Sequence, residues 1–247
     1  ETIFDTLNCK AMIDAALTMM KKHGVELPVM ISLTVSDLAG RTLSGQTVDA
    51  FLASLSPYPI FSVGMNCAFG APQMKPFIEH MAQVAPYYIS AHPNAGLPNE
   101  MGEYDETAES MAPQIAEFID EGIVNIIGGC CGTSPEFIAH YARIAEGKKP
   151  HQVVEKPKYM WLSGLDLLQV DDSVHLPVDA SRFINVGERC NVAGSRKFLR
   201  LINEKNYEEA IGIARKQVAD GAAVVDVNMD DGLLDAKAEM VNFLNMI

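Results

Sequence analysis

The apolar residues in the first part of the chain fall into short runs separated by longer amphipathic stretches. Four of these runs are rich in Ile, Val or Tyr and have the length of strands: 28–33, 60–65, 87–91 and 123–127. Short apolar runs bounded by turn residues are typical of buried strands. Their spacing of roughly 30 residues leaves room for one helix between successive strands, as in parallel sheets.

The stretches between the runs carry signals for helices. A Gly directly after an amphipathic stretch is a common helix end, and Pro is favoured in a first turn. The boundaries that we expect are a helix at 9–23 ending at Gly24, a helix at 107–121 ending at Gly122, a first turn at Pro72, and a capping box of Thr133 and Glu136. Strands and helices therefore alternate, which predicts the α/β class with a parallel sheet.

Two architectures fit this alternation: a closed (β/α)8 barrel of the TIM type and an open doubly wound sheet. No Gly-rich dinucleotide-binding motif follows any of the strands. Reactive residue types recur just after successive strands, as they do around the C-terminal face of a barrel. We therefore predict the TIM-barrel type. Because four strands precede a break in the pattern, residues 1–147 are expected to be the C-terminal half of a barrel.

The alternation stops at 148–181 and then restarts. Lys, Pro and acidic residues replace the helical period there, which predicts a linker. Residues 182–247 are expected to form the N-terminal part of a second barrel, with strands at 182–186 and 223–227 and helices at 207–220 and from 235 onward. Glu1 is not an initiator Met and the last helix has no cap, so we expect a piece of a longer chain.

Composition and charge narrow the possible functions. The 247 residues are 48% hydrophobic, enough for a substantial core, and the formal net charge of -13 disfavours nucleic-acid binding. No long uncharged apolar stretch and no signal-peptide pattern is present in the sequence. We expect a cytoplasmic protein without nucleic-acid or membrane partners that acts on small molecules.

Three of the five cysteines follow predicted strands. Cys67 comes after the second strand, and Cys130 and Cys131 come after the fourth, so their sulfurs are expected to converge at one rim. Three thiolates suit zinc, which is tetrahedral and would keep a fourth position for water or substrate. Cys9 and Cys190 lie in a predicted helix and a predicted loop, and we expect them to be structural.

Other interpretations of these cysteines stay open. The thiols could be buried as small hydrophobic side chains. His92, in the loop after the third strand, could complete a closed, non-catalytic zinc site. A redox pair of Cys130 and Cys131 is the third possibility, although a disulfide between adjacent residues closes a strained ring.

Polar side chains after the other strands suggest further ligand contacts. Asn94, in the loop after the third strand, could reach a ligand. In the last part of the chain, Glu188 and Asn191 follow one expected strand, and Asp226 and Asn228 follow the next. Carboxylate and amide groups can pair with the edge of a heterocycle such as a pterin. Turn formation and loop capping would account for the same residues.

Several of these motifs together resemble known families. GMNC at 64–67, AHPNAGLP at 91–98 and GGCCGT at 128–133 are similar to the homocysteine S-methyltransferase domain. NVGERCN at 185–191 and DVNMD at 226–230 resemble the start of the pterin-binding methyltransferase domain. Their order on one chain, across a linker, resembles the cobalamin-dependent methionine synthase family.

The resemblance implies a methyltransferase in which Cys67, Cys130 and Cys131 bind zinc and the sulfur of homocysteine takes the fourth position. A metal-bound thiol is deprotonated, and the thiolate would accept a methyl group from methylcobalamin. The cobalamin would be held by a module outside this chain. Glu1 matches the strand-end carboxylate that holds the amino group of the substrate in such enzymes.

For the last part of the chain, the resemblance implies that Glu188, Asn191, Asp226 and Asn228 help to hold the pterin of 5-methyltetrahydrofolate, which remethylates the cobalamin. Cys190 stands where the family leads us to expect Thr. A homocysteine methyltransferase with another methyl donor is the alternative. The chain by itself is not expected to catalyse the full reaction.

Overall fold

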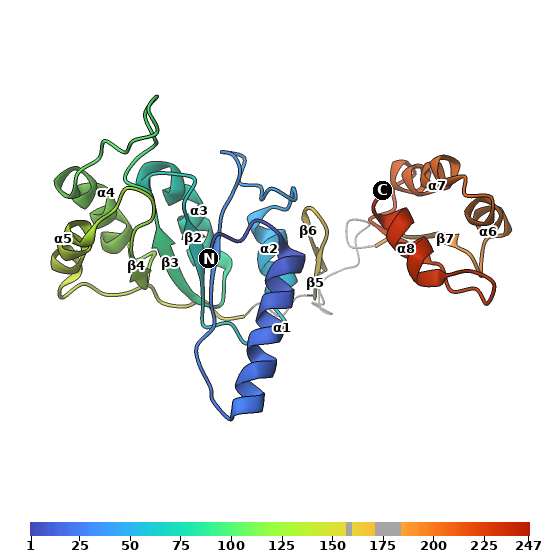
Figure 1. Cartoon of the computed structure of the whole chain (residues 1–247), viewed down its shortest axis with the longest axis horizontal. Coiled ribbons are helices and arrows are strands. Elements are labelled where there is room, and N and C mark those ends of the chain that lie inside the picture. The colour runs from blue at the N-terminus through green and yellow to red at the C-terminus, as the bar shows by residue number, and fades with distance from the viewer. Residues whose placement is uncertain (157–159, 171–183) are drawn as a thin grey trace, which may run out of the picture. The chain divides into compact units, whose positions relative to one another are not determined.

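The computed structural model describes residues 1–156, 160–170 and 184–247 (Figure 1). The chain divides into two compact units, Glu1–Asp172 and Ser173–Ile247. Each unit has its own cluster of buried apolar side chains. The domain limits expected from the sequence, 1–147, 148–181 and 182–247, stay predictions.

One parallel sheet of four strands organises the first unit. In their order across the sheet, the strands are β1 (Met30–Leu33), β2 (Ser62–Asn66), β3 (Tyr88–His92) and β4 (Ile126–Ile127). Leu33, Met65, Ala91 and Ile127 lie side by side in register. The carboxyl ends of the strands therefore share one edge, and the predicted parallel α/β architecture is confirmed.

Five helices accompany this sheet: α1 (Thr6–His23), α2 (Val48–Leu55), α3 (Ala71–Val84), α4 (Ala108–Asp120) and α5 (Pro135–Ala145). α1 ends at Gly24 as predicted, with a left-handed φ of 64°, and α4 begins one residue later than predicted because Thr107 is its N-cap. The predicted capping box of Thr133 and Glu136 does not form. The Thr133 hydroxyl donates to the carbonyl of Cys130 instead, and Ser134 is the N-cap residue of α5, without a side-chain hydrogen bond to the helix.

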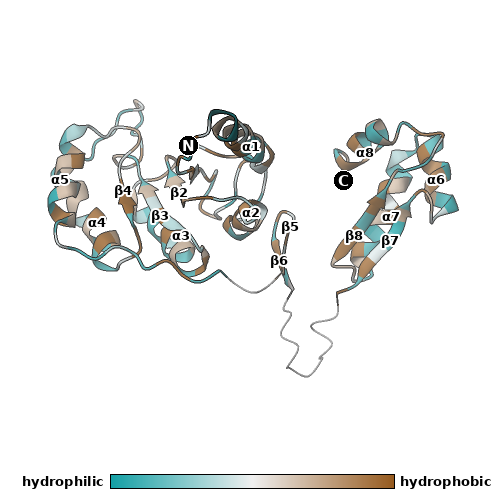
Figure 2. Cartoon of the chain, turned by 90° about the horizontal axis from the view of Figure 1, so that it is seen from below, coloured by the Kyte–Doolittle hydropathy of each residue, from teal (hydrophilic) through white to brown (hydrophobic). Residues whose placement is uncertain are grey.

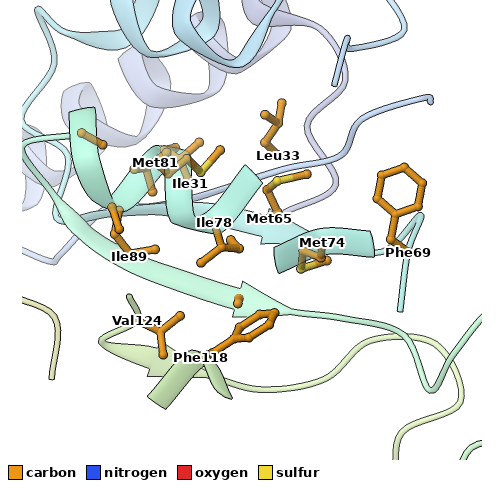
Figure 3. Close-up of a cluster of buried hydrophobic side chains, with 14 of the residues drawn as sticks. Ile31, Leu33, Met65, Phe69, Met74, Ile78, Met81, Ile89, Phe118 and Val124 are labelled. Carbon is orange, nitrogen blue, oxygen red and sulfur yellow. The ribbon is translucent and has the colours of Figure 1, made fainter. Parts of the chain in front are cut away.

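The core of the first unit lies between the sheet and its helices. Every residue of β2 is buried, and β4 is drawn as strongly hydrophobic in Figure 2. On α3, Met74, Ile78 and Met81 recur at helical spacing and have no exposed surface. Figure 3 shows them in one cluster with Met65 and Phe118. Burial of each such side chain contributes about 1.5–3 kcal/mol, which fixes the helices that carry the strand-end loops.

A hairpin within the expected linker packs beside α2. It consists of the antiparallel strands β5 (Met160–Ser163) and β6 (Leu167–Val170). The carbonyl of Leu165 at its tip accepts from the N–H of Thr47 at 2.9 Å, and Ser163 Oγ lies 2.6 Å from Ser54 Oγ. This hairpin was not predicted, because its strands are short and the first of them is largely exposed. Expected linker residues 157–159 and 171–181 lie outside the described residues.

The second unit has a parallel pair of strands, β7 (Val186–Asn191) and β8 (Val224–Asn228), with α6 (Arg196–Asn203), α7 (Tyr207–Ala219) and α8 (Ala236–Leu244). The strand expected at 182–186 is misplaced, since β7 begins at Val186 and residues 182–183 lie outside the described part. The sequence pattern did not predict this strand correctly, because it contains the charged residues Glu188 and Arg189. A bulge between Gly187 and Cys190 also interrupts the alternation of its side chains. α6 was not predicted, because it is only 8 residues long.

Both parallel sheets are open within the described residues, one with four strands and the other with two. The parallel α/β class is therefore shown, whereas the TIM-barrel type and the arrangement of two partial barrels stay predictions. No helix among the described residues is long and apolar enough to cross a membrane.

Candidate metal centre

Three cysteine sulfurs meet at the carboxyl ends of β2 and β4. The Sγ atoms of Cys67, Cys130 and Cys131 all lie within 4.8 Å of one another. Cys67 Sγ is 3.6 Å from Cys131 Sγ, and Cys130 Sγ is 3.9 Å from Cys131 Sγ. All three residues are half-buried. Cys9 and Cys190 are fully buried elsewhere, each in the core cluster of its own unit.

A strained turn after β2 directs the first of these sulfurs. Cys67 and Ala68 have φ angles of 61° and 60°, in the left-handed region that L residues rarely occupy. Such conformations cost of order 1–3 kcal/mol each and persist where the surroundings fix them. Here the N–H of Cys67 donates to the carbonyl of His92 at 3.2 Å, and the N–H of Phe69 donates to the carbonyl of Cys67 at 2.7 Å.

The loops after β3 and β4 are joined by hydrogen bonds that position the other two cysteines. The N–H of Cys130 donates to the carbonyl of Pro93 at 2.9 Å. The N–H of Cys131 donates to Asn94 Oδ1 at 3.0 Å, and the N–H of Ala95 donates to the carbonyl of Cys131 at 2.8 Å. Asn94 is only 2% exposed. Its amide oxygen therefore fixes the backbone of the cysteine pair, a contact that the sequence did not predict.

The two glycines before the cysteine pair are required by the space around them rather than by their backbone conformation. Neither Gly128 nor Gly129 has a positive φ. A Cβ at Gly128 would lie 2.5 Å from Cδ2 of His92, and one at Gly129 would lie 2.4 Å from Oγ1 of Thr133. These positions lack side chains because neighbours occupy the space. The left-handed residue of the loop is Gly132, with φ 78°.

Two further side chains lie beside the sulfurs. Asn66 Nδ2 lies 3.8 Å from Cys130 Sγ, and the hydroxyl of Tyr104 lies near Cys131. Burial raises the pKa of Cys130 and would raise that of Cys131, but hydrogen bonds from Cys67 and Tyr104 outweigh burial and lower the pKa of Cys131. The position of Asn66 directly before Cys67 could have indicated its role in the site. No pattern in the sequence indicated a role for Tyr104.

His92 and Glu1 lie near this edge but outside the sulfur cluster. No nitrogen of His92 belongs to the group of mutually close ligand atoms found among the described residues. Burial lowers the pKa of His92, and the charge of Glu1 opposes this shift. Glu1 is exposed. Two residues later, Ile3 pairs with Leu33 in a parallel bridge, so this segment lies beside β1.

The predicted ligand contacts of the second unit lie at and near the ends of β7 and β8. Asn191 and Asn228 are partners in the strand register. Asn191 Oδ1 accepts from the N–H of Ala193 at 2.9 Å, and Asn228 Oδ1 accepts from the N–H of Asp230 at 2.8 Å. Both amide oxygens therefore cap turns, as the structural alternative expected. Glu188 and Asp226 are exposed, and Glu188 lies within β7 rather than in the loop after it.

A second group of potential ligand atoms lies on the helices of the first unit. Glu109 in the first turn of α4 approaches Glu136 and His140 of α5, and His140 Nε2 lies 3.8 Å from Glu109 Oε1. Both carboxylates are exposed and lie in first helical turns, where the helix dipole stabilises them without any ion. The sequence did not predict this group, and its geometry is explained by the helix termini.

Two family models match the chain. The homocysteine S-methyltransferase model matches residues 1–145, and the pterin-binding enzyme model matches residues 187–247. The first match spans more than half of the chain and includes all three clustered cysteines. The chain therefore belongs to the homocysteine S-methyltransferase family, and a pterin-binding segment follows in the same sequence.

Solved structures of the homocysteine methyltransferase MmuM from Escherichia coli are also similar to the chain. The apo form is 20% identical, covers 58% of this chain and 48% of its own, and has a TM-score of 0.42. The metallated form is 21% identical, covers 53% of this chain and 40% of its own, and has a TM-score of 0.38. The chain thus spans about half of the length of these proteins. At this distance they add nothing to the family assignment.

Proposed function

We propose that the first unit binds zinc through Cys67, Cys130 and Cys131 and activates the thiol of homocysteine for methylation. The spacing of the sulfurs carries the proposal: 3.6 Å between Cys67 and Cys131 and 3.9 Å between Cys130 and Cys131. A tetrahedral ion with Zn–S bonds of about 2.3 Å separates its sulfurs by about 3.8 Å. The donor set therefore fits zinc in number, chemistry and spacing.

The zinc ion and the side chains around the sulfur cluster would each contribute to binding and activating homocysteine. Bound zinc supplies the deprotonation of a coordinated thiol at neutral pH. The cysteines leave the fourth tetrahedral position to the substrate, because no fourth His, Cys, Asp or Glu joins the cluster in the described part of the chain. Asn66 and Tyr104 donate hydrogen bonds to two of the thiolates, and Glu1 holds the amino group of homocysteine.

The reaction itself is a nucleophilic displacement at a methyl carbon. Homocysteine loses its thiol proton on binding, and its sulfur then forms a bond to the methyl carbon to give methionine. The donor keeps the electron pair of the broken bond. We propose methylcobalamin as the donor, held by a module outside this chain, and a cytoplasmic location. The sulfur cluster followed by a pterin-binding segment, the order seen in cobalamin-dependent methionine synthases, favours this donor over the alternative of another methyl donor.

Zinc titration of the chain against a competing chelator tests the metal centre. We expect one tightly bound zinc per chain. Replacing Cys67, Cys130 or Cys131 with Ala should each lower the affinity by more than about 100-fold, beyond the loss typical for groups around a metal site. Cys9→Ala and Cys190→Ala are matched controls, because both thiols are buried outside the cluster, and they should leave the affinity unchanged. Full zinc affinity in Cys130→Ala would sink the proposal.

For the second unit we propose binding of the pterin ring of 5-methyltetrahydrofolate by Glu188, Asn191, Asp226 and Asn228. Support comes from the register pairing of Asn191 with Asn228 and from the family match over 187–247. Two strand ends can contact a flat ring from one side, so we expect weak binding in a fluorescence titration. Tight binding that disappears in Asn228→Ala would contradict this expectation of a partial site.

A further inference from the structure

The amide of Asn66, at the end of β2, uses all of its hydrogen-bonding capacity. Asn66 Oδ1 accepts from the N–H of Thr2 at 2.8 Å and from Ser32 Oγ at 2.6 Å. Asn66 Nδ2 donates to Thr2 Oγ1 at 2.9 Å and points to Cys130 Sγ at 3.8 Å. The residue is 2% exposed. A buried polar side chain with partners on three separate segments is expensive to remove and strongly oriented.

The orientation of this amide follows from one of its partners. A backbone N–H can only donate, so the N–H of Thr2 requires the oxygen of Asn66 on its side. Rotating the amide by 180° would set Nδ2 against that N–H and leave two donors facing each other. The Nδ2 group is thereby directed to the sulfur of Cys130. This thiol consequently receives an N–H donor, which favours its thiolate form and limits its rotation.

The same amide connects the sulfur to the N-terminal segment. Thr2, which contacts both ends of the Asn66 amide, directly follows Glu1. The segment is also held to the sheet, because the N–H of Ile3 donates to the carbonyl of Ser32 at 3.0 Å and the N–H of Thr34 donates to the carbonyl of Ile3 at 2.8 Å. The amide thus contacts both the proposed metal ligand Cys130 and Thr2, the neighbour of the residue whose carboxylate is proposed to hold the amino group of the substrate.

We propose that Asn66 is a positioning residue that sets the Cys130 sulfur relative to the segment carrying Glu1, so that homocysteine is held by its sulfur and its amino group together. This inference rests on the proposed function and adds a specificity role to it. Without the amide, a simple thiol should still reach the metal. A ligand with both groups should lose the advantage of binding at two points, because their spacing is no longer fixed.

The test compares Asn66→Ser with Asn125→Ser in the full 247-residue chain loaded with Co²⁺. Asn125 is a matched control. Its Oδ1 accepts from the N–H of Ile89 and its Nδ2 donates to the carbonyl of His151, both at 2.8 Å, without contact to sulfur. Homocysteine is titrated against 4-mercaptobutyrate, which has the same thiol and carboxylate but no amino group. The sulfur-to-cobalt charge-transfer band reports both the site and the binding.

Asn66→Ser should weaken homocysteine binding by about 10- to 100-fold, the range typical for groups around a metal site, and should affect 4-mercaptobutyrate much less. Its charge-transfer band should move to lower energy, because the thiolate loses an N–H donor. Asn125→Ser should match the wild type in both. Ser32→Ala removes one partner of the amide and leaves Asn66 in place. It should change the homocysteine affinity and the charge-transfer band in the same direction as Asn66→Ser, to a smaller extent. It replaces Asn66→Ser if that variant does not fold.

Equal losses for the two ligands, or an unshifted band in Asn66→Ser, would overturn the positioning role while leaving the proposed function intact. A wild-type chain that binds no cobalt, or whose cobalt spectrum does not change when homocysteine is added, would instead overturn the proposed function and this inference with it. The wild-type spectra therefore separate the two failures before any variant is measured.

Discussion

The strand ends of the two units carry similar residue types but are built differently. In the first unit, Asn66 and Asn94 are buried, and each connects a cysteine of the cluster to another segment. In the second unit, Asn191 and Asn228 are half-buried and cap the turns that follow their own strands. The polar side chains of the first edge therefore connect separate segments to one another, whereas those of the second edge hold only the turns beside them.

The largest contrast in stability is expected between two glycines. Gly128→Ala would place a Cβ 2.5 Å from the His92 ring and should lower the free energy of unfolding of the first unit by about 1–3 kcal/mol. Gly212→Ala in α7 meets nothing within 4 Å and should raise that of the second unit by up to about 1 kcal/mol. Urea unfolding curves of both variants measure the difference. A Gly128→Ala chain as stable as the wild type would show that the first edge is not tightly packed.

A smaller contrast is expected between Asn94→Ala and Asn228→Ala. Asn94→Ala removes the acceptor of the Cys131 N–H and leaves a buried donor unpaired, which costs about 1–3 kcal/mol. Asn228→Ala removes a turn cap that water can replace, so its cost should stay below about 1 kcal/mol. Thermal unfolding of each variant supplies the comparison. Equal losses of stability in the two variants would mean that the two asparagines contribute equally to the strand ends of their units.

The smallest expected effect concerns pH. His80 Nε2 lies 2.7 Å from Asp49 Oδ1, and this hydrogen bond raises the pKa of His80 against the effect of burial. The pair therefore stabilises the first unit at pH values below the ordinary His pKa of about 6.5, and this contribution disappears as pH rises through the raised pKa. Both side chains are more than a third exposed, so the effect should be below about 1 kcal/mol.

Asp49→Asn should remove this contribution, whereas the lowered pKa of His92 remains and makes the first unit more stable as pH rises between the lowered and the ordinary His pKa. Residues 184–247 contain no His and should add no such dependence between about pH 6 and 8. Unfolding curves measured at several pH values check both statements. A loss of stability with rising pH that survives in Asp49→Asn would assign that loss to another group.

The sequence predicted the strands of the first unit because each is short, apolar and bounded by turns. It also predicted that Cys67, Cys130 and Cys131 converge, since residues after neighbouring parallel strands share one edge. It misplaced β7, because Glu188 and Arg189 lie within that strand and a bulge interrupts the alternation. It missed the role of Asn66, because a buried amide acquires its partners from Thr2, Ser32 and Cys130, which only the folded chain brings together.

X-ray absorption at the zinc edge distinguishes a zinc site that accepts the substrate from a closed one. We expect about three sulfurs and one lighter atom around the metal in the zinc-loaded chain, and about four sulfurs after homocysteine is added, because the three cysteines leave the fourth position to the substrate. Binding should release one proton as the thiol becomes a thiolate. A spectrum with four protein ligands that homocysteine does not change would rule out activation of the substrate at this metal and indicate a closed structural zinc site.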